Sequence, residues 1–143
     1  MFVNYPALFL KEKESEAYTV IFPDLQGCVT YGDSINDALR MAQDVLGAYL
    51  FEYYTKPNEI PKASSIDDIE LKIDEEDKEY FLYEGSFKNY VSLDLTDYVK
   101  KSSNKNVKKT LTIPSYLNEA GIENNINFSL ILQEALKKEL KMI

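Results

Sequence analysis

Three short apolar segments open the chain and alternate with turn-forming residues. They cover residues 5–10, 17–22 and 28–31, and the breaks between them contain charged residues, Pro23 and Gly27. Segments of this length, rich in aromatic and β-branched residues and bounded by Gly, Pro and Asp, are typical of an antiparallel meander. We therefore expect a three-stranded sheet at the N-terminus.

The spacing of the apolar positions then changes to three and four residues. Nine such positions recur between Ile35 and Tyr53, which places them on one face of a helix of about five turns. Ser34 is the expected N-cap, and Asp37 stands where its carboxylate can accept from the N–H of Ser34. Pro57 marks the expected end of this helix.

A long polar segment separates this helix from the next strand. Residues 58–79 are polar, with eight carboxylates between Asp67 and Glu79, and we expect two patterned pieces, residues 66–73 and 80–83, to lie on the surface. Strict alternation over residues 90–95 predicts a fourth strand that returns to the meander. This order of elements indicates an α+β fold with an antiparallel three- to four-stranded sheet and one packed helix.

The C-terminal part of the chain follows a different pattern. Residues 100–105 are basic and polar without an apolar anchor. We interpret residues 99–106 as a linker between an α+β domain of residues 1–98 and a second domain of residues 107–143.

Within the second domain we expect one strand and two helices. Residues 107–113 alternate like a strand and end at a proline that suits the first turn of a helix over residues 115–124. Asn125 suits the left-handed position that ends this helix. Ser129 is the expected N-cap of a last helix over residues 130–141.

Composition excludes several classes of protein. The 143 residues include no His, which excludes His-dependent nucleophilic catalysis and His-bearing zinc sites. The single Cys28 cannot form an internal disulfide, and no stretch approaches the ~18 consecutive apolar residues of a membrane span. The N-terminus lacks a signal-peptide pattern, so we expect a cytoplasmic protein. We also expect no membrane contact, no cofactor and no metal site.

Charge is distributed unevenly along the chain. Residues 1–98 hold 8 Lys and Arg against 20 Asp and Glu, a balance of -12, whereas residues 99–143 hold 8 Lys against 4 Glu, a balance of +4. Because fields of opposite sign attract different molecules, an acidic body with a basic tail suggests two partners. The alternative, that the acidic body is merely solvated, stays open.

The last 37 residues are too few for a stable core of their own. Pairing of the strand with the same strand of a second copy would satisfy its backbone groups and stack both sets of helices. In such a ribbon Leu111 and Ile113 point inward. The side chains that point outward, toward the width of a DNA major groove, are Lys108, Thr110 and Thr112. The free N–H groups near Ser129 would bind a backbone phosphate.

These residues resemble a known DNA-binding family. Residues 108–114, followed by Asn127-Phe128-Ser129 at the start of a Leu-rich helix, resemble a ribbon-helix-helix domain. The resemblance implies DNA contacts through Lys108, Thr110, Thr112, Asn127 and Ser129. A ribbon that only dimerises is the alternative.

The first domain also resembles a known family. Residues 23–34 read Pro-Asp-Leu-x-Gly-Cys-x-Thr-x-Gly-Asp-Ser and are followed by Asp37-Ala38, which resembles the signature of the HicB antitoxins. Many members of that family have Glu at the position of Asp37. Those proteins pair a truncated RNase H-like domain with a ribbon-helix-helix or helix-turn-helix tail.

The resemblance to HicB implies a function without chemistry. Such an antitoxin binds and occludes a small basic HicA-like RNase toxin, dimerises through its C-terminal domain and represses its own operon by binding operator DNA. The toxin-contact residues are unknown. Asp24 and Asp33 lie at turns beside the strands and are candidates, although turn formation is the commoner role of Asp there.

Two other functions are possible from the sequence. One is a stand-alone transcriptional repressor whose first domain senses a small ligand. The other is a metal-dependent nuclease, which needs clustered carboxylates to hold two divalent ions. The expected first strand has no carboxylate, and Cys28 has no basic neighbour to lower the pKa of its thiol. We therefore predict that the chain is not an enzyme.

Overall fold

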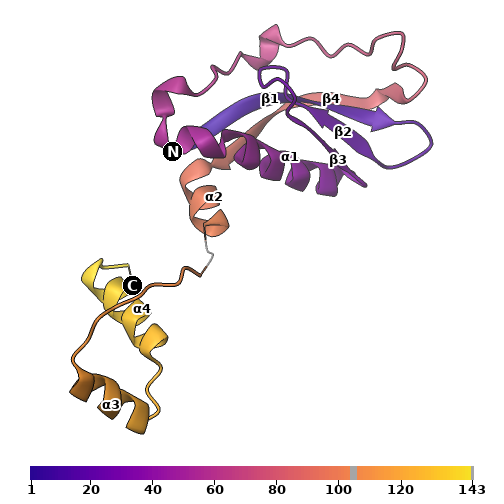
Figure 1. The fold of residues 1–143 in the computed structure, drawn as a ribbon. Helices are drawn as coiled ribbons and strands as arrows, with labels where there is room; N and C mark the ends of the chain where they lie inside the picture. The colour runs from indigo at the N-terminus through magenta and orange to yellow at the C-terminus, as the bar shows by residue number, and fades with distance from the viewer. Residues whose placement is uncertain (104–105, 143) are drawn as a thin grey trace. The chain divides into compact units, whose positions relative to one another are not determined.

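The chain divides into two structural units, Met1–Lys105 and Asn106–Ile143. The computed structural model describes residues 1–103 and 106–142. The first unit holds a four-stranded sheet with helices, and the second holds two short helices (Figure 1).

The sheet of the first unit is antiparallel throughout. Its strands are β1 (Phe2–Glu12), β2 (Tyr18–Ile21), β3 (Val29–Gly32) and β4 (Phe81–Asp94), in the spatial order β3-β2-β1-β4. The predicted meander and the return of a fourth strand to its edge are both confirmed. The α+β class is therefore correct.

One helix covers one face of this sheet (Figure 1). Helix α1 (Ile35–Leu50) buries a line of small and branched side chains, among them Ala38, Ala42 and Leu46 at 0% exposure, against the strands. It ends earlier than predicted, because the chain tightens into the 3-10 helix η1 (Phe51–Thr55). This packing forms the larger of two apolar clusters in the unit.

The predicted cap of α1 is confirmed in part. The Oγ of Ser34 accepts from the N–H of Asp37 at 3.1 Å. The Asp37 carboxylate, however, accepts from the N–H of Asp33 at 3.0 Å, one residue before the expected donor Ser34. The reciprocal bond therefore ties the helix to the end of β3.

The opposite face of the sheet is covered by residues 57–80, which we call the strap (Figure 1). Ile73 of the strap is 3% exposed and packs with Leu8 and Leu10 of β1. The prediction that this piece lies on the surface is therefore wrong at Ile73. The many carboxylates around Ile73 make the segment look uniformly polar in the sequence, although this one apolar side chain is buried.

Side chains of β4 form hydrogen bonds with the backbone of the strap. The hydroxyl of Tyr83 accepts from the N–H of Ile73 at 2.9 Å, and that of Tyr90 accepts from the N–H of Ile66 at 2.9 Å. Strand β4 begins nine residues before the predicted residue 90, since its first half contains Gly85 and a bulge that interrupts the alternation.

A second helix, α2 (Leu95–Ser102), follows β4 directly. Leu95 is fully buried, and the ring of Tyr98 lies against Gly47 of α1. The expected linker over residues 99–106 is thus wrong in its first half, because residues 99–102 are helical. Residues 104 and 105 of that linker lie outside the described residues.

The second unit contains α3 (Ser115–Glu123) and α4 (Phe128–Glu139). Both predicted helices are confirmed, and Asn125 has the expected left-handed backbone with φ 53°. The cap predictions need correction: the proline occupies the N-cap of α3 rather than its first turn, and α4 is capped by Asn127 rather than Ser129. Residues 107–113 have no regular secondary structure in the single chain.

Candidate binding surfaces

Apolar side chains of the second unit are largely exposed. Within its described residues only Gly121 is buried, beneath the ring of Phe128. Thirteen large apolar side chains are 41–85% exposed: Val107, Leu111, Ile113, Tyr116, Leu117, Ile122, Ile126, Phe128, Leu130, Ile131, Leu136, Leu140 and Met142. Extended apolar surface of this kind is typical of sites that contact another molecule.

The segment before α3 is the part of this unit predicted to form a ribbon. Leu111 and Ile113 are 54% and 43% exposed in the single chain, and the described part of the unit contains no strand that could pair with residues 107–113. The single chain therefore does not show their predicted inward orientation, and the paired ribbon stays a prediction. Lys108, Thr110 and Thr112 are exposed as well.

Two of the predicted DNA-contact residues lie together at the start of α4. The Oδ1 of Asn127 accepts from the N–H of Leu130 at 3.0 Å, so its side chain serves as the helix cap. The Oγ of Ser129 accepts from Nε2 of Gln133 at 3.2 Å and lies in the first turn. Sequence reasoning chose the wrong cap because Ser and Asn are almost equally favoured there.

The structural boundary changes the charge of the tail. Lys100 and Lys101 belong to α2, and Lys101 pairs with Asp97 at 2.9 Å. Counted by compact unit, Met1–Lys105 holds 11 Lys and Arg against 20 Asp and Glu, or -9, and Asn106–Ile143 holds 5 Lys against 4 Glu, or +1. The first unit remains strongly acidic, whereas the second is nearly neutral.

Of the two candidate toxin contacts, Asp24 has a structural role. Its carboxylate accepts from the N–H of Ser64 at 2.8 Å and from the Ser64 hydroxyl at 2.6 Å. These bonds tie the turn after β2 to the strap. Because both carboxylate oxygens are engaged and the residue is half-buried, Asp24 is poorly placed to meet a partner.

Asp33 lies in a different environment. It is exposed at the end of β3, next to Tyr31, whose side chain is 49% exposed. Partial burial and the carboxylates of Glu12, Asp33 and Asp37 raise the pKa of Tyr31. The backbone N–H of Asp33 and the guanidinium of Arg40 lower the pKa of Asp37. Negative charge from β1, from the end of β3 and from α1 therefore acts on one exposed aromatic ring.

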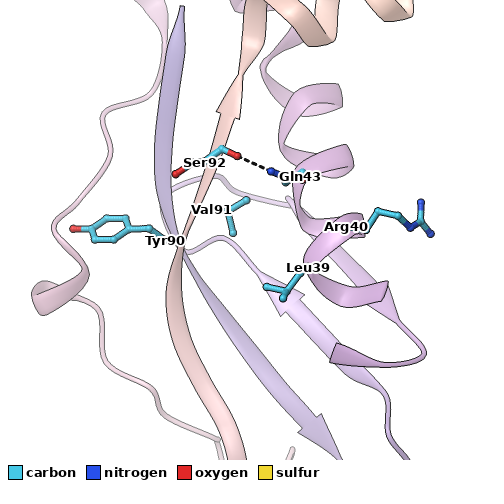
Figure 2. A pocket seen from close by; sticks show the side chains of 6 residues that line it. All are labelled: Leu39, Arg40, Gln43, Tyr90, Val91 and Ser92. Atoms are coloured by element: carbon cyan, nitrogen blue, oxygen red, sulfur yellow. Dashed lines mark hydrogen bonds between the residues drawn. The ribbon is translucent and has the colours of Figure 1, made fainter. Parts of the chain in front are cut away.

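A groove of about 400 Å³ lies between α1 and β4 (Figure 2). Nε2 of Gln43 donates to the carbonyl of Ser92 at 3.0 Å across it. Leu39 and Val91 form its apolar floor, and Arg40 projects away from it. The lining holds no carboxylate, thiol or basic pair that could perform acid–base chemistry.

Neither the thiol of Cys28 nor the carboxylates of the described residues provide a reactive nucleophile or a metal site. Burial raises the pKa of the Cys28 thiol to about 11, which keeps it protonated and unreactive. Among residues 1–103 and 106–142, no three Asp, Glu or Cys side chains are grouped closely enough to hold a metal ion. None of the helices described there has the length and apolar character to cross a membrane.

Two curated proteins are similar to parts of this chain. A curated protein of Haemophilus phage HP1, described as an uncharacterized 14.9 kDa protein in the rep-hol intergenic region, is 24% identical over 74% of this chain and 71% of its own length. Antitoxin HicB 2 of Photorhabdus laumondii is 36% identical over 44% of each chain.

Structure and family comparisons extend over most of the chain. A chain of the toxin–antitoxin complex from Streptococcus pneumoniae is 34% identical, with a TM-score of 0.63, over 97% of this chain and 99% of that one. The family model of the HicB-like antitoxins of bacterial toxin–antitoxin systems matches residues 5–135. The chain therefore belongs to the HicB-like antitoxin family.

Proposed function

We propose that this antitoxin binds and occludes a small basic HicA-like RNase through its first unit and represses its own operon through its second, acting in the cytoplasm. Family membership makes the chain a non-enzymatic regulator with an antitoxin role. The similar chain from Streptococcus pneumoniae belongs to a toxin–antitoxin complex, which supports a toxin as the partner. In this proposal the first unit is a partial RNase H-like domain that blocks the toxin without performing catalysis.

The acidic surface of the first unit supports the toxin half of the proposal. Its balance of -9 creates a negative field. An RNase must attract RNA phosphates with Lys and Arg, and carboxylates can occupy the same positions. The field therefore accelerates association with a basic enzyme and repels RNA.

The exposed apolar side chains of the second unit support the dimerisation and DNA-binding half of the proposal. Two copies that pair residues 107–113 as an antiparallel ribbon would bury Leu111 and Ile113 and satisfy both backbones. The ribbon would then present Lys108, Thr110 and Thr112 to the major groove, in the manner of a ribbon-helix-helix dimer. The start of α4 at Asn127 and Ser129 would hold a phosphate.

A double substitution separates the two activities. Lys108→Ala with Thr110→Ala removes groups that face DNA in the ribbon, so operator binding in a gel-shift assay should fall by at least about tenfold. Toxin neutralisation, measured as rescue of growth, should persist because the first unit is unchanged. Lys138→Ala, which removes an exposed charge from the last turn of α4, is the matched control.

Two results would contradict this proposal. Equal operator binding by the double variant and the wild-type chain would refute the ribbon assignment. Failure of the protein encoded by the neighbouring reading frame to copurify with the full chain would refute the toxin partner, and would favour a stand-alone repressor that senses a ligand.

A further inference from the structure

Strand β3 forms an open edge of the sheet. Its one strand neighbour among the described residues is β2. The N–H of Phe22 donates to the carbonyl of Cys28 at 3.1 Å, and hydrogen-bonded pairs alternate along an antiparallel ladder. Val20 therefore exchanges bonds with Thr30, whereas Val29 and Tyr31 direct their N–H and C=O groups away from β2.

Side chains of the same two residues are also uncovered. A Cβ on Gly32 would lie 2.2 Å from the backbone nitrogen of Ala38, so Gly32 and Thr30 face α1. Val29 and Tyr31 face the other side, where they stay 50% and 49% exposed beyond the strap. Free backbone groups and exposed apolar side chains therefore coincide at one edge.

The charges around this edge are mainly negative. Glu12, Asp33 and Asp37 all act electrostatically on Tyr31, and within the described residues Asp37 alone of the three forms an ion pair, with Arg40 at 2.7 Å. Asp33 is exposed at the end of the strand. A neighbouring strand that carries Lys or Arg would find the exposed carboxylate of Asp33 at the end of β3.

We propose that the β3 edge is the surface on which the basic protein partner docks, by adding one strand of its own to the sheet. The identity of that partner rests on the proposed antitoxin function. Backbone bonds from Val29 and Tyr31 supply affinity, their side chains contact the partner's apolar residues, and Asp33 pairs with its basic residues while Glu12 adds to the negative field. The strand order becomes partner-β3-β2-β1-β4.

A second copy of this chain does not suit the edge. Two β3 strands side by side would bring both sets of carboxylates into one short interface, where like charges repel. The β4 edge is also less suitable, since its register shifts at a bulge and Tyr83, Lys88 and Tyr90 are engaged by the strap. Charge and access therefore favour β3 and a basic partner.

The test measures affinity between the full-length chain and the purified protein encoded by the neighbouring reading frame. Val29→Pro removes one outward N–H without removing a bond to β2, and proline is tolerated at the first residue of an edge strand. Val29→Thr keeps that N–H and is its control. Asp33→Lys reverses an edge charge, and Glu52→Lys reverses an exposed charge at the far end of α1.

We expect Val29→Pro and Asp33→Lys each to weaken binding by at least about tenfold, and both controls to bind within about twofold of wild type. Circular dichroism checks that each variant is folded. If Val29→Pro does not fold, the affinity of Asp33→Lys tests the inference by itself. If the wild-type chain binds and the edge variants bind equally well, this inference is wrong and the antitoxin function stands.

Two further outcomes overturn the inference by other routes. If the wild-type chain fails to bind, the proposed function is refuted together with it. If the edge variants change only the oligomeric state of the free antitoxin, by sedimentation, then β3 pairs with a second copy instead.

Discussion

Two glycines that flank β3 have different physical roles. Gly27 has φ 79°, a left-handed backbone, but a Cβ added there would meet no atom within 4 Å. Gly32 has no such backbone requirement, yet a Cβ there would lie 2.4 Å from the Cα of Ala38. The first glycine is required by conformation and the second by the close approach of β3 and α1.

These roles predict unequal costs of substitution. Gly32→Ala should lower the free energy of unfolding by about 3 kcal/mol or more, because the obstructing atoms are backbone and cannot move aside. Gly27→Ala should cost only about 1 kcal/mol, and Gly27→Asn less, since Asn tolerates a positive φ. Urea denaturation measures all three. Equal losses for Gly32→Ala and Gly27→Ala would contradict the close approach.

The binding surface could be predicted only in part from individual residues in the sequence. Asp24 and Asp33 look alike in the sequence, since both follow a strand at a turn. The structure separates them, because Asp24 meets Ser64 from 40 residues away while Asp33 stays exposed. A local sequence pattern cannot predict a hydrogen-bond partner that is so distant in the chain. The role of Tyr31 was missed for the same reason, since its exposure depends on where the strap ends.

At the scale of elements, prediction succeeded where the apolar period was regular. The meander, α1 and both helices of the second unit follow patterns with one repeating period. The first half of β4 was missed because Gly85 and a bulge break its alternation, and α2 because Lys residues dominate its last turn. In both cases tertiary contacts, such as the burial of Leu95, stabilise an element that local pattern does not reveal.

The cap of α4 gives a prediction at this scale. Asn127→Ala removes the acceptor for the N–H of Leu130 and should lower the free energy of unfolding by about 1 kcal/mol. Ser129→Ala should change it by less than about 0.5 kcal/mol, because Ser129 bonds only to the exposed Gln133. Thermal melts at one fixed protein concentration compare the two. A larger effect from Ser129→Ala would restore Ser129 as the cap.

For the whole molecule, the position of the boundary decides how the two units can be separated. A chain cut after residue 98 would lose half of α2 and with it part of the packing around Leu95 and Tyr98. A chain that ends at Ser103 keeps α2 complete. Separation at that point therefore preserves the first unit, which contains both apolar clusters.

The chain that ends at Ser103 should be a monomer, whereas the full chain of 16.5 kDa should sediment as a dimer. The thirteen exposed apolar side chains all lie in the second unit, so their removal eliminates the surface that requires a second copy. Ile113→Asp in the full chain should also give a monomer, since a buried unpaired charge prevents ribbon pairing. Sedimentation equilibrium at several concentrations distinguishes these states. A dimer of the shortened chain would locate the self-association in the first unit, and a dimeric Ile113→Asp chain would show that the ribbon does not form it.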